Sequence, residues 1–251
     1  MRSKNTSSKP ILARARKPAE AAARTPIQKF IAPIVKHWRA IVIAAGGVVL
    51  IGAAVGGFYW LRNDREDRAA RAYAHLQGIA ADRAADAALK AGKDGKIDEK
   101  TLEAATIKDL NEFISKYGNT GAGRAAQYEL ASLYFEAGKT KEAAALFAEV
   151  AAKGKGPERT MAAVGVADCA VAAGDYKSAI PKYQKVYDAA PDGFPGVAVG
   201  VKLAACLEHE GKADDAAKIY RRILDYNALS PFAADAAEAL SKIEQVKEGS
   251  Q

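Results

Sequence analysis

The chain has 251 residues, of which 27% are charged, and carries 37 Lys and Arg against 30 Asp and Glu, for a pI near 9.2. A basic chain suggests nucleic-acid binding, but residues 1–39 hold ten basic residues and one acid, whereas the remainder holds 27 basic and 29 acidic residues. Because the whole excess belongs to a short tail beside an apolar stretch, the charge predicts membrane topology and no nucleic-acid partner.

Residues 1–39 are the first predicted segment, a basic tail without the sustained apolar face of a packed core. Prolines and serines are spread along it, so we expect most of it to be disordered and cytoplasmic. Beside a bilayer such a tail rests on anionic lipid, which contributes roughly 1 kcal/mol per basic residue near the surface. Its composition also resembles a mitochondrial presequence, and composition alone leaves that alternative open.

Residues 40–61 run for 22 residues without a charge, which as a helix covers roughly 33 Å, about the hydrocarbon thickness of a bilayer. Trp38, Tyr59 and Trp60 stand at its ends, where amphipathic rings favour the headgroup level. The pattern predicts a single transmembrane helix rather than the buried helix of a soluble domain.

The basic residues before the span predict its orientation. Lys29, Lys36 and Arg39 approach the membrane without a nearby acid, which by the positive-inside rule keeps the N-terminus in the cytoplasm. The apolar region starts too late, is too long and lacks the cleavage site of a signal peptide. We therefore expect the bacterial inner membrane, with the following domain in the periplasm.

Gly52 and Gly56 form a Gly-x-x-x-Gly step within the span. Such a step allows another helix to approach closely. Because small residues are common in membrane helices, we treat this pair as a candidate packing face only.

Residues 62–118 are predicted to form a helical stalk and a degenerate leading repeat. Residues 64–91 are rich in Ala with interleaved charges and no Pro, which favours a helix continuing from the span. A break at residues 93–96 precedes a second helix, residues 98–117, which ends at Gly118. The run DGKID is similar to half of a calcium-binding loop, but the positions that need oxygen ligands hold Lys90, Gly92 and Thr101.

Residues 119–251 repeat a pattern around Gly138, Gly174 and Gly211, which are 36 and 37 residues apart. At matching distances from each glycine stand two alanines and an aromatic residue: Ala131, Ala143 and Phe147; Ala167, Ala179 and Tyr183; Ala204, Ala216 and Tyr220. We expect the alanines where antiparallel helices cross, the aromatics between hairpins, and each glycine at a chain reversal.

This pattern resembles the tetratricopeptide repeat over roughly residues 121–227. Pro191 falls where the family places a closing proline, and Tyr134 is a first-helix aromatic that Ala170 and Leu207 replace in the later units. The resemblance implies an α-solenoid of helix hairpins, which a C-terminal capping helix closes. Together with the predicted transmembrane helix and helical stalk, this gives an all-α fold for the chain. Ser230 and Pro231 suit the N-cap and first turn of that last helix, which we expect to end near Val246.

Tetratricopeptide solenoids bind partners in a concave groove lined by the first helices of their hairpins, and the resemblance implies such a groove here. The residues assigned to it by analogy are Tyr128, Ser132, Phe135, Met161, Val164, Asp168, Val171, Val201, Glu208 and His209. This largely apolar lining favours a helical or extended hydrophobic segment. A carboxylate clamp needs converging Lys, Arg and Asn, and Glu129, Gly165 and Lys202 do not provide them. The protein's own stalk or capping helix is the other candidate occupant.

The arrangement of tail, span, stalk and repeats resembles a family of bacterial inner-membrane proteins, the ancillary subunits of the secretion translocon. The resemblance implies a scaffold beside the translocon and periplasmic chaperones. A scaffold for cell division or for assembly of another envelope complex is the alternative. A further alternative is an enzyme whose active site cannot be recognised in the sequence.

Catalytic and cofactor motifs are lacking in the sequence. His37, His75 and His209 are too scattered to suggest a metal or acid-base set, and no phosphate loop or nucleophile elbow occurs. Cys169 and Cys206 occupy equivalent places in successive first helices, about 10 Å apart, which is too far for a disulfide. We therefore expect two buried thiols, no enzyme activity and no cofactor.

Overall fold

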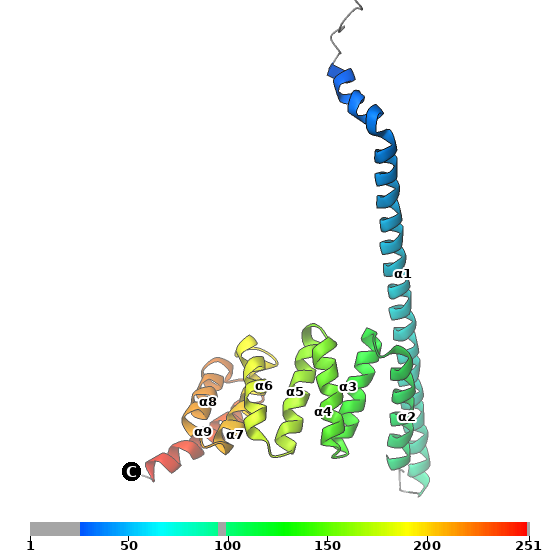
Figure 1. The fold of residues 1–251 in the computed structure, drawn as a ribbon. Coiled ribbons are helices and arrows are strands. Elements are labelled where there is room, and N and C mark those ends of the chain that lie inside the picture. Colours follow the sequence, from blue (N-terminus) through cyan, green and yellow to red (C-terminus); the bar gives the residue numbers. More distant parts are fainter. Residues whose placement is uncertain (1–25, 95–98, 250–251) are drawn as a thin grey trace, which may run out of the picture. The chain divides into compact units, whose positions relative to one another are not determined.

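The computed structural model describes residues 26–94 and 99–249, and all secondary structure within these ranges is α-helical (Figure 1). The helices are α1 (Pro26–Asp94), α2 (Glu99–Tyr117), α3 (Gly121–Glu136), α4 (Thr140–Lys153), α5 (Gly156–Ala172), α6 (Tyr176–Ala189), α7 (Gly196–His209), α8 (Ala213–Asn227) and α9 (Ala233–Glu248). The prediction of an all-α fold is confirmed.

Contacts divide the chain into two units, Met1–Leu61 and Arg62–Gln251. Within the first, α1 begins at Pro26, so the part of the predicted tail between Pro26 and the span is helical, and the expectation of a mostly disordered tail stays a prediction. Proline suits a first helical position, and extending an existing long helix costs little. The backbone of His37 is non-helical, with φ −114° and ψ 18°, which marks a kink. The rest of the predicted tail lies outside the described residues.

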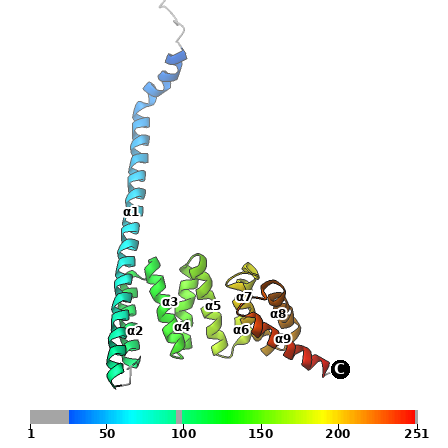
Figure 2. The same cartoon turned by 180° about the vertical axis from the view of Figure 1, so that it is seen from behind.

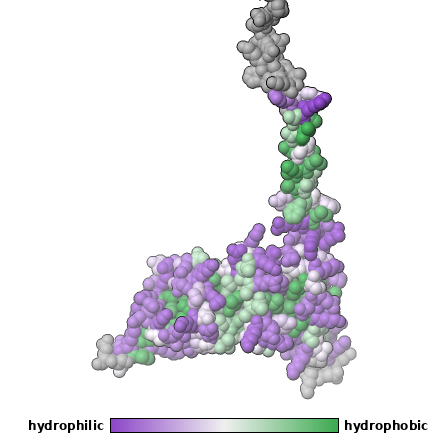
Figure 3. Space-filling model, viewed as in Figure 1, coloured by the Kyte–Doolittle hydropathy of each residue, from purple (hydrophilic) through white to green (hydrophobic). Residues whose placement is uncertain are grey.

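The apolar stretch of α1 exposes its large side chains, among them Ile43 and Leu50. α1 is the one described helix that is long and apolar enough to cross a membrane, by length and composition. Figure 3 shows this apolar belt on α1, followed by hydrophilic residues. Gly52 and Gly56 have no described atom within 4 Å of the place a Cβ would occupy, so their packing role stays a prediction.

The stalk, residues 62–94 of α1, packs against α2 and α3 in the second unit, and both views show α2 beside it (Figures 1 and 2). Tyr73 of the stalk shares an apolar cluster with Leu110 and Phe113 of α2. Arg83 of the stalk forms an ion pair with Asp109. The stalk therefore occupies the place of a first helix beside α2. The break predicted at residues 93–96 falls largely on residues outside the described ranges.

Three hairpins follow, α3 with α4, α5 with α6, and α7 with α8. Gly138, Gly174 and Gly211 end the first helices with φ of 73°, 76° and 73°, a left-handed backbone that favours glycine. The residue after each glycine donates a backbone hydrogen bond back into the helix: Lys139 to Tyr134 (2.8 Å), Asp175 to Ala170 (2.9 Å) and Lys212 to Leu207 (2.8 Å). The predicted chain reversals are confirmed.

The repeated alanines and aromatics form the core of these hairpins. All of the residues expected there are buried: Ala131, Ala143, Phe147, Ala167, Ala179, Tyr183, Ala204, Ala216 and Tyr220. Phe147 also packs onto the following hairpin, where a Cβ on Gly165 would stand 2.8 Å from its ring carbons. Small residues therefore let neighbouring helices approach closely.

The capping helix α9 begins later than predicted, at Ala233. Ser230 is not its N-cap: its backbone N–H donates to Asn227 (2.8 Å), its carbonyl accepts from Ala233 (3.1 Å), and its buried hydroxyl has no hydrogen-bond partner. The residues from Ser230 to Phe232 form a turn, which brings Phe232 against the core of the last hairpin. Packing of this aromatic side chain accounts for the later start.

A candidate protein-binding groove

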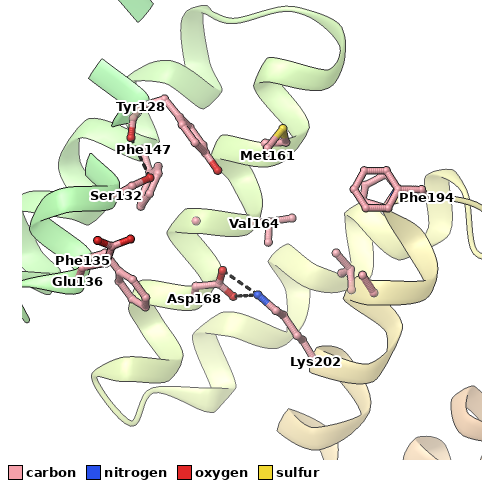
Figure 4. A pocket seen from close by; sticks show the side chains of 14 residues that line it. Tyr128, Ser132, Phe135, Glu136, Phe147, Met161, Val164, Asp168, Phe194 and Lys202 are labelled. Atoms are coloured by element: carbon pink, nitrogen blue, oxygen red, sulfur yellow. Dashed lines mark hydrogen bonds and ion pairs between the residues drawn. The ribbon is translucent and has the colours of Figure 1, made fainter. Parts of the chain in front are cut away.

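The first helices α3, α5 and α7 line a pocket of about 320 Å³ (Figure 4). Six residues that the sequence assigned to the groove line it: Tyr128, Ser132, Phe135, Met161, Val164 and Asp168. An adjoining pocket of about 410 Å³ shares Phe135 and Asp168 and includes the predicted Val171 and His209. We call these two pockets together the groove.

Two predicted residues lie outside this lining. Val201 is half-buried against the core of the second and third hairpins. Glu208 accepts a hydrogen bond from the hydroxyl of Tyr220, 2.7 Å away, so it joins α7 to α8. Both sit on α7, whose rotation in the stack turns these positions away from the pockets.

Several lining residues were not assigned by sequence. Phe194, in the loop between α6 and α7, is 84% exposed and projects at the edge of the pocket, and Pro195 follows it (Figure 4). Tyr176 also lines the groove, and so does Lys202, which we considered from the sequence only in rejecting a carboxylate clamp. The repeat pattern did not predict Phe194, because the pattern does not include the loop in which this residue lies.

The floor of the groove is aromatic and aliphatic. The rings of Tyr128 and Phe147 meet edge to face with centroids 5.2 Å apart. Met161 remains 46% exposed, and Val164 lies beside it on α5. Such a surface buries apolar side chains, and methionine adapts to different partners.

Asp168 is the polar centre of this floor. Lys202 Nζ lies 2.7 Å from its Oδ1 and 2.9 Å from its Oδ2 (Figure 4). The hydroxyl of Tyr183 donates to the same carboxylate. Burial, followed by this hydrogen bond and the charge of Asp168, raises the pKa of Tyr183, so the phenol stays neutral.

Acidic side chains outnumber basic ones along the first pocket. Its lining includes Glu136 and Asp168 against Lys202, which is held by Asp168. Glu136 is exposed at the end of α3. The groove therefore joins a largely apolar floor, which holds the Asp168–Lys202 ion pair, to one exposed acid at its edge.

The stalk reaches one end of this surface. The hydroxyl of Tyr73 donates to Glu129 of α3 at 2.6 Å. Tyr73 and Gln77 border a pocket of about 630 Å³ that shares Tyr128, Ser132 and Met161 with the first pocket of the groove. No described stalk residue lines the groove, and α9 packs against α8 instead. Among the described residues, the groove is therefore open to a partner.

Other chemistry is scarce in the described part of the chain. No cluster of three or more His, Cys, Asp or Glu residues there could hold a metal ion. His209 stacks on Tyr176 with centroids 4.0 Å apart and an interplanar angle of 7°. Cys169 and Cys206 are free and buried, which confirms the prediction of two buried thiols.

Comparison with known proteins identifies the repeats. Two family models, both described as tetratricopeptide repeat, match residues 122–194 and 170–243. The fold is similar to the tetratricopeptide-like repeats of a putative kinesin light chain from Podosopora anserina, with 18% identity over 60% of this chain and 81% of that chain and a TM-score of 0.52.

A second structure of the Podosopora anserina repeats has 18% identity over 60% of this chain and 82% of that chain, with a TM-score of 0.51. MamA from Desulfovibrio magneticus RS-1 has 14% identity over 70% of this chain and 96% of that chain, with a TM-score of 0.47. The search of curated proteins finds no match. The chain thus contains tetratricopeptide repeats, a fold typical of non-enzymatic scaffolds for protein interaction.

Proposed function

Because residues 122–243 are tetratricopeptide repeats, we propose that this protein is a membrane-tethered scaffold whose groove holds apolar segments of other proteins. One observation carries the proposal: the groove has an apolar floor and is not filled by any described segment of the chain. A concave apolar surface with a few polar groups is the usual form of a binding site.

The tether in this proposal is the apolar stretch of α1, residues 40–61. Its length and composition support a membrane span, and the basic residues before it support a cytoplasmic N-terminus. With this orientation the repeats work in the periplasm of a bacterial envelope. A mitochondrial inner membrane is the alternative compartment.

The proposed partners are proteins that emerge from the secretion translocon and the periplasmic chaperones that receive them. Newly translocated chains expose apolar segments, which match the floor formed by Phe135, Met161 and Val164. A scaffold for cell division or for assembly of another envelope complex is the second candidate. The two candidate functions differ in the partner proteins, and both use the same groove to bind them.

Site-specific photocrosslinking in cells tests the groove. A photoreactive side chain replaces Val164, on the groove floor, or Lys141, which is exposed on α4 and lies outside the groove. We expect partner proteins to crosslink from position 164 and not from position 141. Recovery of translocon subunits or periplasmic chaperones supports the first assignment; division or outer-membrane assembly proteins alone support the second. Equal crosslinking from both positions contradicts binding in the groove.

Topology is tested separately with a reporter fused after Gln251. A reporter that is active only outside the cytoplasm should give signal in this fusion. Signal from a cytoplasm-specific reporter instead would reverse the proposed orientation and leave the groove experiment unaffected.

A further inference from the structure

A further pocket, of about 440 Å³, lies between α4, α5 and α6 and shares no residue with the groove. Ala163 and Val166 of α5 are half-buried within it, and Ala148 and Ala151 of α4 border one side. Alanine side chains are short, so they leave room for an apolar group to approach the helix backbones. We call this feature the alanine pocket.

The lining of the alanine pocket contains three basic residues and no acid. Arg159 comes from α5, and Lys182 and Lys185 come from α6. Arg159 donates to the carbonyl of Gly154 at 2.9 Å, and Lys182 donates to the carbonyl of Ser178 at 2.7 Å. None of the three forms an ion pair with a described carboxylate, which distinguishes them from Lys202 in the groove.

Asp175, whose carboxylate interacts with the charge of Lys182, does not line the pocket. The pKa of Asp175 is lowered chiefly by hydrogen bonds from Ser178 and, to a smaller extent, by the charge of Lys182. Its carboxylate accepts from the backbone N–H of Ser178 at 3.0 Å and caps the start of α6. The charge of the alanine pocket itself is therefore positive.

The basic groups are arranged along a helix. Lys182 and Lys185 are three residues apart on α6, which places them on one face about one turn from each other. A helix of a partner protein could lie beside α6. If Asp or Glu recurs in it every third or fourth residue, its carboxylates have the same spacing as the two lysines. Its apolar face then packs onto the alanines, the common mode of helix-in-groove recognition.

We propose that the alanine pocket binds an acidic amphipathic helix of a partner protein. The interaction is independent of the groove proposed above. Apolar contact with α4 and α5 provides affinity, and Lys182, Lys185 and Arg159 select acidic partners over neutral ones. The scaffold then has two interaction surfaces that differ in charge.

Binding of a synthetic peptide to the full-length protein tests this proposal. The probe is a labelled helical peptide of about 18 residues with leucines on one face and glutamates beside them, and its twin has glutamine at each glutamate. The protein is held in nanodiscs of zwitterionic lipid, and binding is measured by fluorescence anisotropy. We expect the acidic peptide to bind at least about tenfold more tightly than its twin.

Charge reversal locates the site. The double substitution Lys182→Glu and Lys185→Glu should weaken binding of the acidic peptide about tenfold. The matched control, Lys141→Glu with Lys177→Glu, changes the net charge equally at exposed positions of α4 and α6 outside the pocket. We expect little effect from this control. The basic tail is the same in both variants, so its contribution cancels.

A third variant, Ala148→Trp, fills the alanine pocket from an exposed position that tolerates a large side chain. It should abolish peptide binding while the circular dichroism spectrum stays unchanged. The proposal is overturned if the acidic peptide does not bind or if its twin binds equally well. It is also overturned if the control variant weakens binding as much as the double substitution does, or if the Ala148→Trp variant binds the peptide as the wild type does. Binding of laurate that depends on Lys182 and Lys185, without peptide binding, assigns the pocket to a lipid and also overturns it.

Discussion

The hydroxyl of Tyr183 donates a hydrogen bond to the carboxylate of Asp168 and thereby joins the two helices of the second hairpin beneath the groove. The corresponding positions of the first hairpin hold Phe147 and Ser132, and the Ser132 hydroxyl donates to its own helix, to Tyr128 at 3.1 Å. The second hairpin thus has two polar side chains that bind each other. The first hairpin has an apolar ring and a short side chain at the same two positions. The pair in the second hairpin also holds the carboxylate that binds Lys202.

Removal of this hydroxyl should reduce stability. Tyr183→Phe leaves the carboxylate of Asp168 with Lys202 but without its buried donor, and we expect the free energy of unfolding to fall by about 1.5 kcal/mol. Urea unfolding followed by circular dichroism measures the change. Tyr226→Phe is the control, because Tyr226 is 69% exposed, and it should leave the midpoint unchanged. Equal midpoints for the two variants would show that the hydrogen bond contributes no net stability.

Alkaline pH should destabilise the repeats. Burial is the largest cause that raises the pKa of Tyr73, Tyr183 and Tyr220 in the folded state, followed by a hydrogen bond to Glu129, Asp168 and Glu208 respectively. Below about pH 10 these phenols are neutral in both states. Above it the unfolded chain loses these protons while the folded chain retains them, so stability falls as pH rises.

Thermal melting between pH 8 and pH 11 measures this alkaline loss. The double variant Tyr183→Phe and Tyr220→Phe should melt at a lower temperature than the wild type at pH 8 and show a smaller further decrease toward pH 11. An unchanged slope in the variant would assign the alkaline loss to other groups, such as the two buried thiols.

A methyl group at Gly165 should disrupt contact between the first and second hairpins. Its Cβ would lie 2.8 Å from ring carbons of Phe147, whose ring is buried and cannot move freely. We expect Gly165→Ala to destabilise the protein by about 1 to 3 kcal/mol. Gly193→Ala is the control, since no described atom lies within 4 Å of its Cβ position. Recovery of stability when Gly165→Ala is combined with Phe147→Leu would identify the clash as the cause.

The two cysteine thiols should be unreactive in the folded protein. Burial, followed by the charge of Asp168, raises the pKa of both Cys169 and Cys206, which lowers the fraction of reactive thiolate. A thiol reagent such as 5,5′-dithiobis-(2-nitrobenzoic acid) should modify both in urea and neither under native conditions. Rapid modification in the native state would contradict their burial.

Local periodicity predicted the repeats because each helix crossing needs a small residue and each chain reversal needs a residue with a left-handed backbone conformation. Gly138 shows this for the turns, and Ala167 shows it for the crossings. The same reasoning failed at Ser230, where the N-cap signal was present but the start of α9 is delayed. Packing of Phe232 against the last hairpin is a tertiary interaction that the local signal does not contain.

The groove was predictable in part. Met161 and Val164 follow from the analogy with first helices, whereas Phe194 lies in a loop that no period describes. Glu208 was assigned to the groove but binds Tyr220. A shift of a few residues along α7 changes which side a residue faces, because each step turns a helix by about 100°.

The sequence by itself determined the apolar stretch of α1, the order of the helices, the reversals and the buried alanines, since these depend on composition and on spacing within one hairpin. Only the tertiary structure decided which side chains from different hairpins meet. Lys202 reaches Asp168 across 34 residues of chain, and the alanine pocket brings together Ala148, Ala163 and Lys185 from three helices. Such contacts depend on how each helix is rotated against the next, and that rotation results from packing of the whole stack.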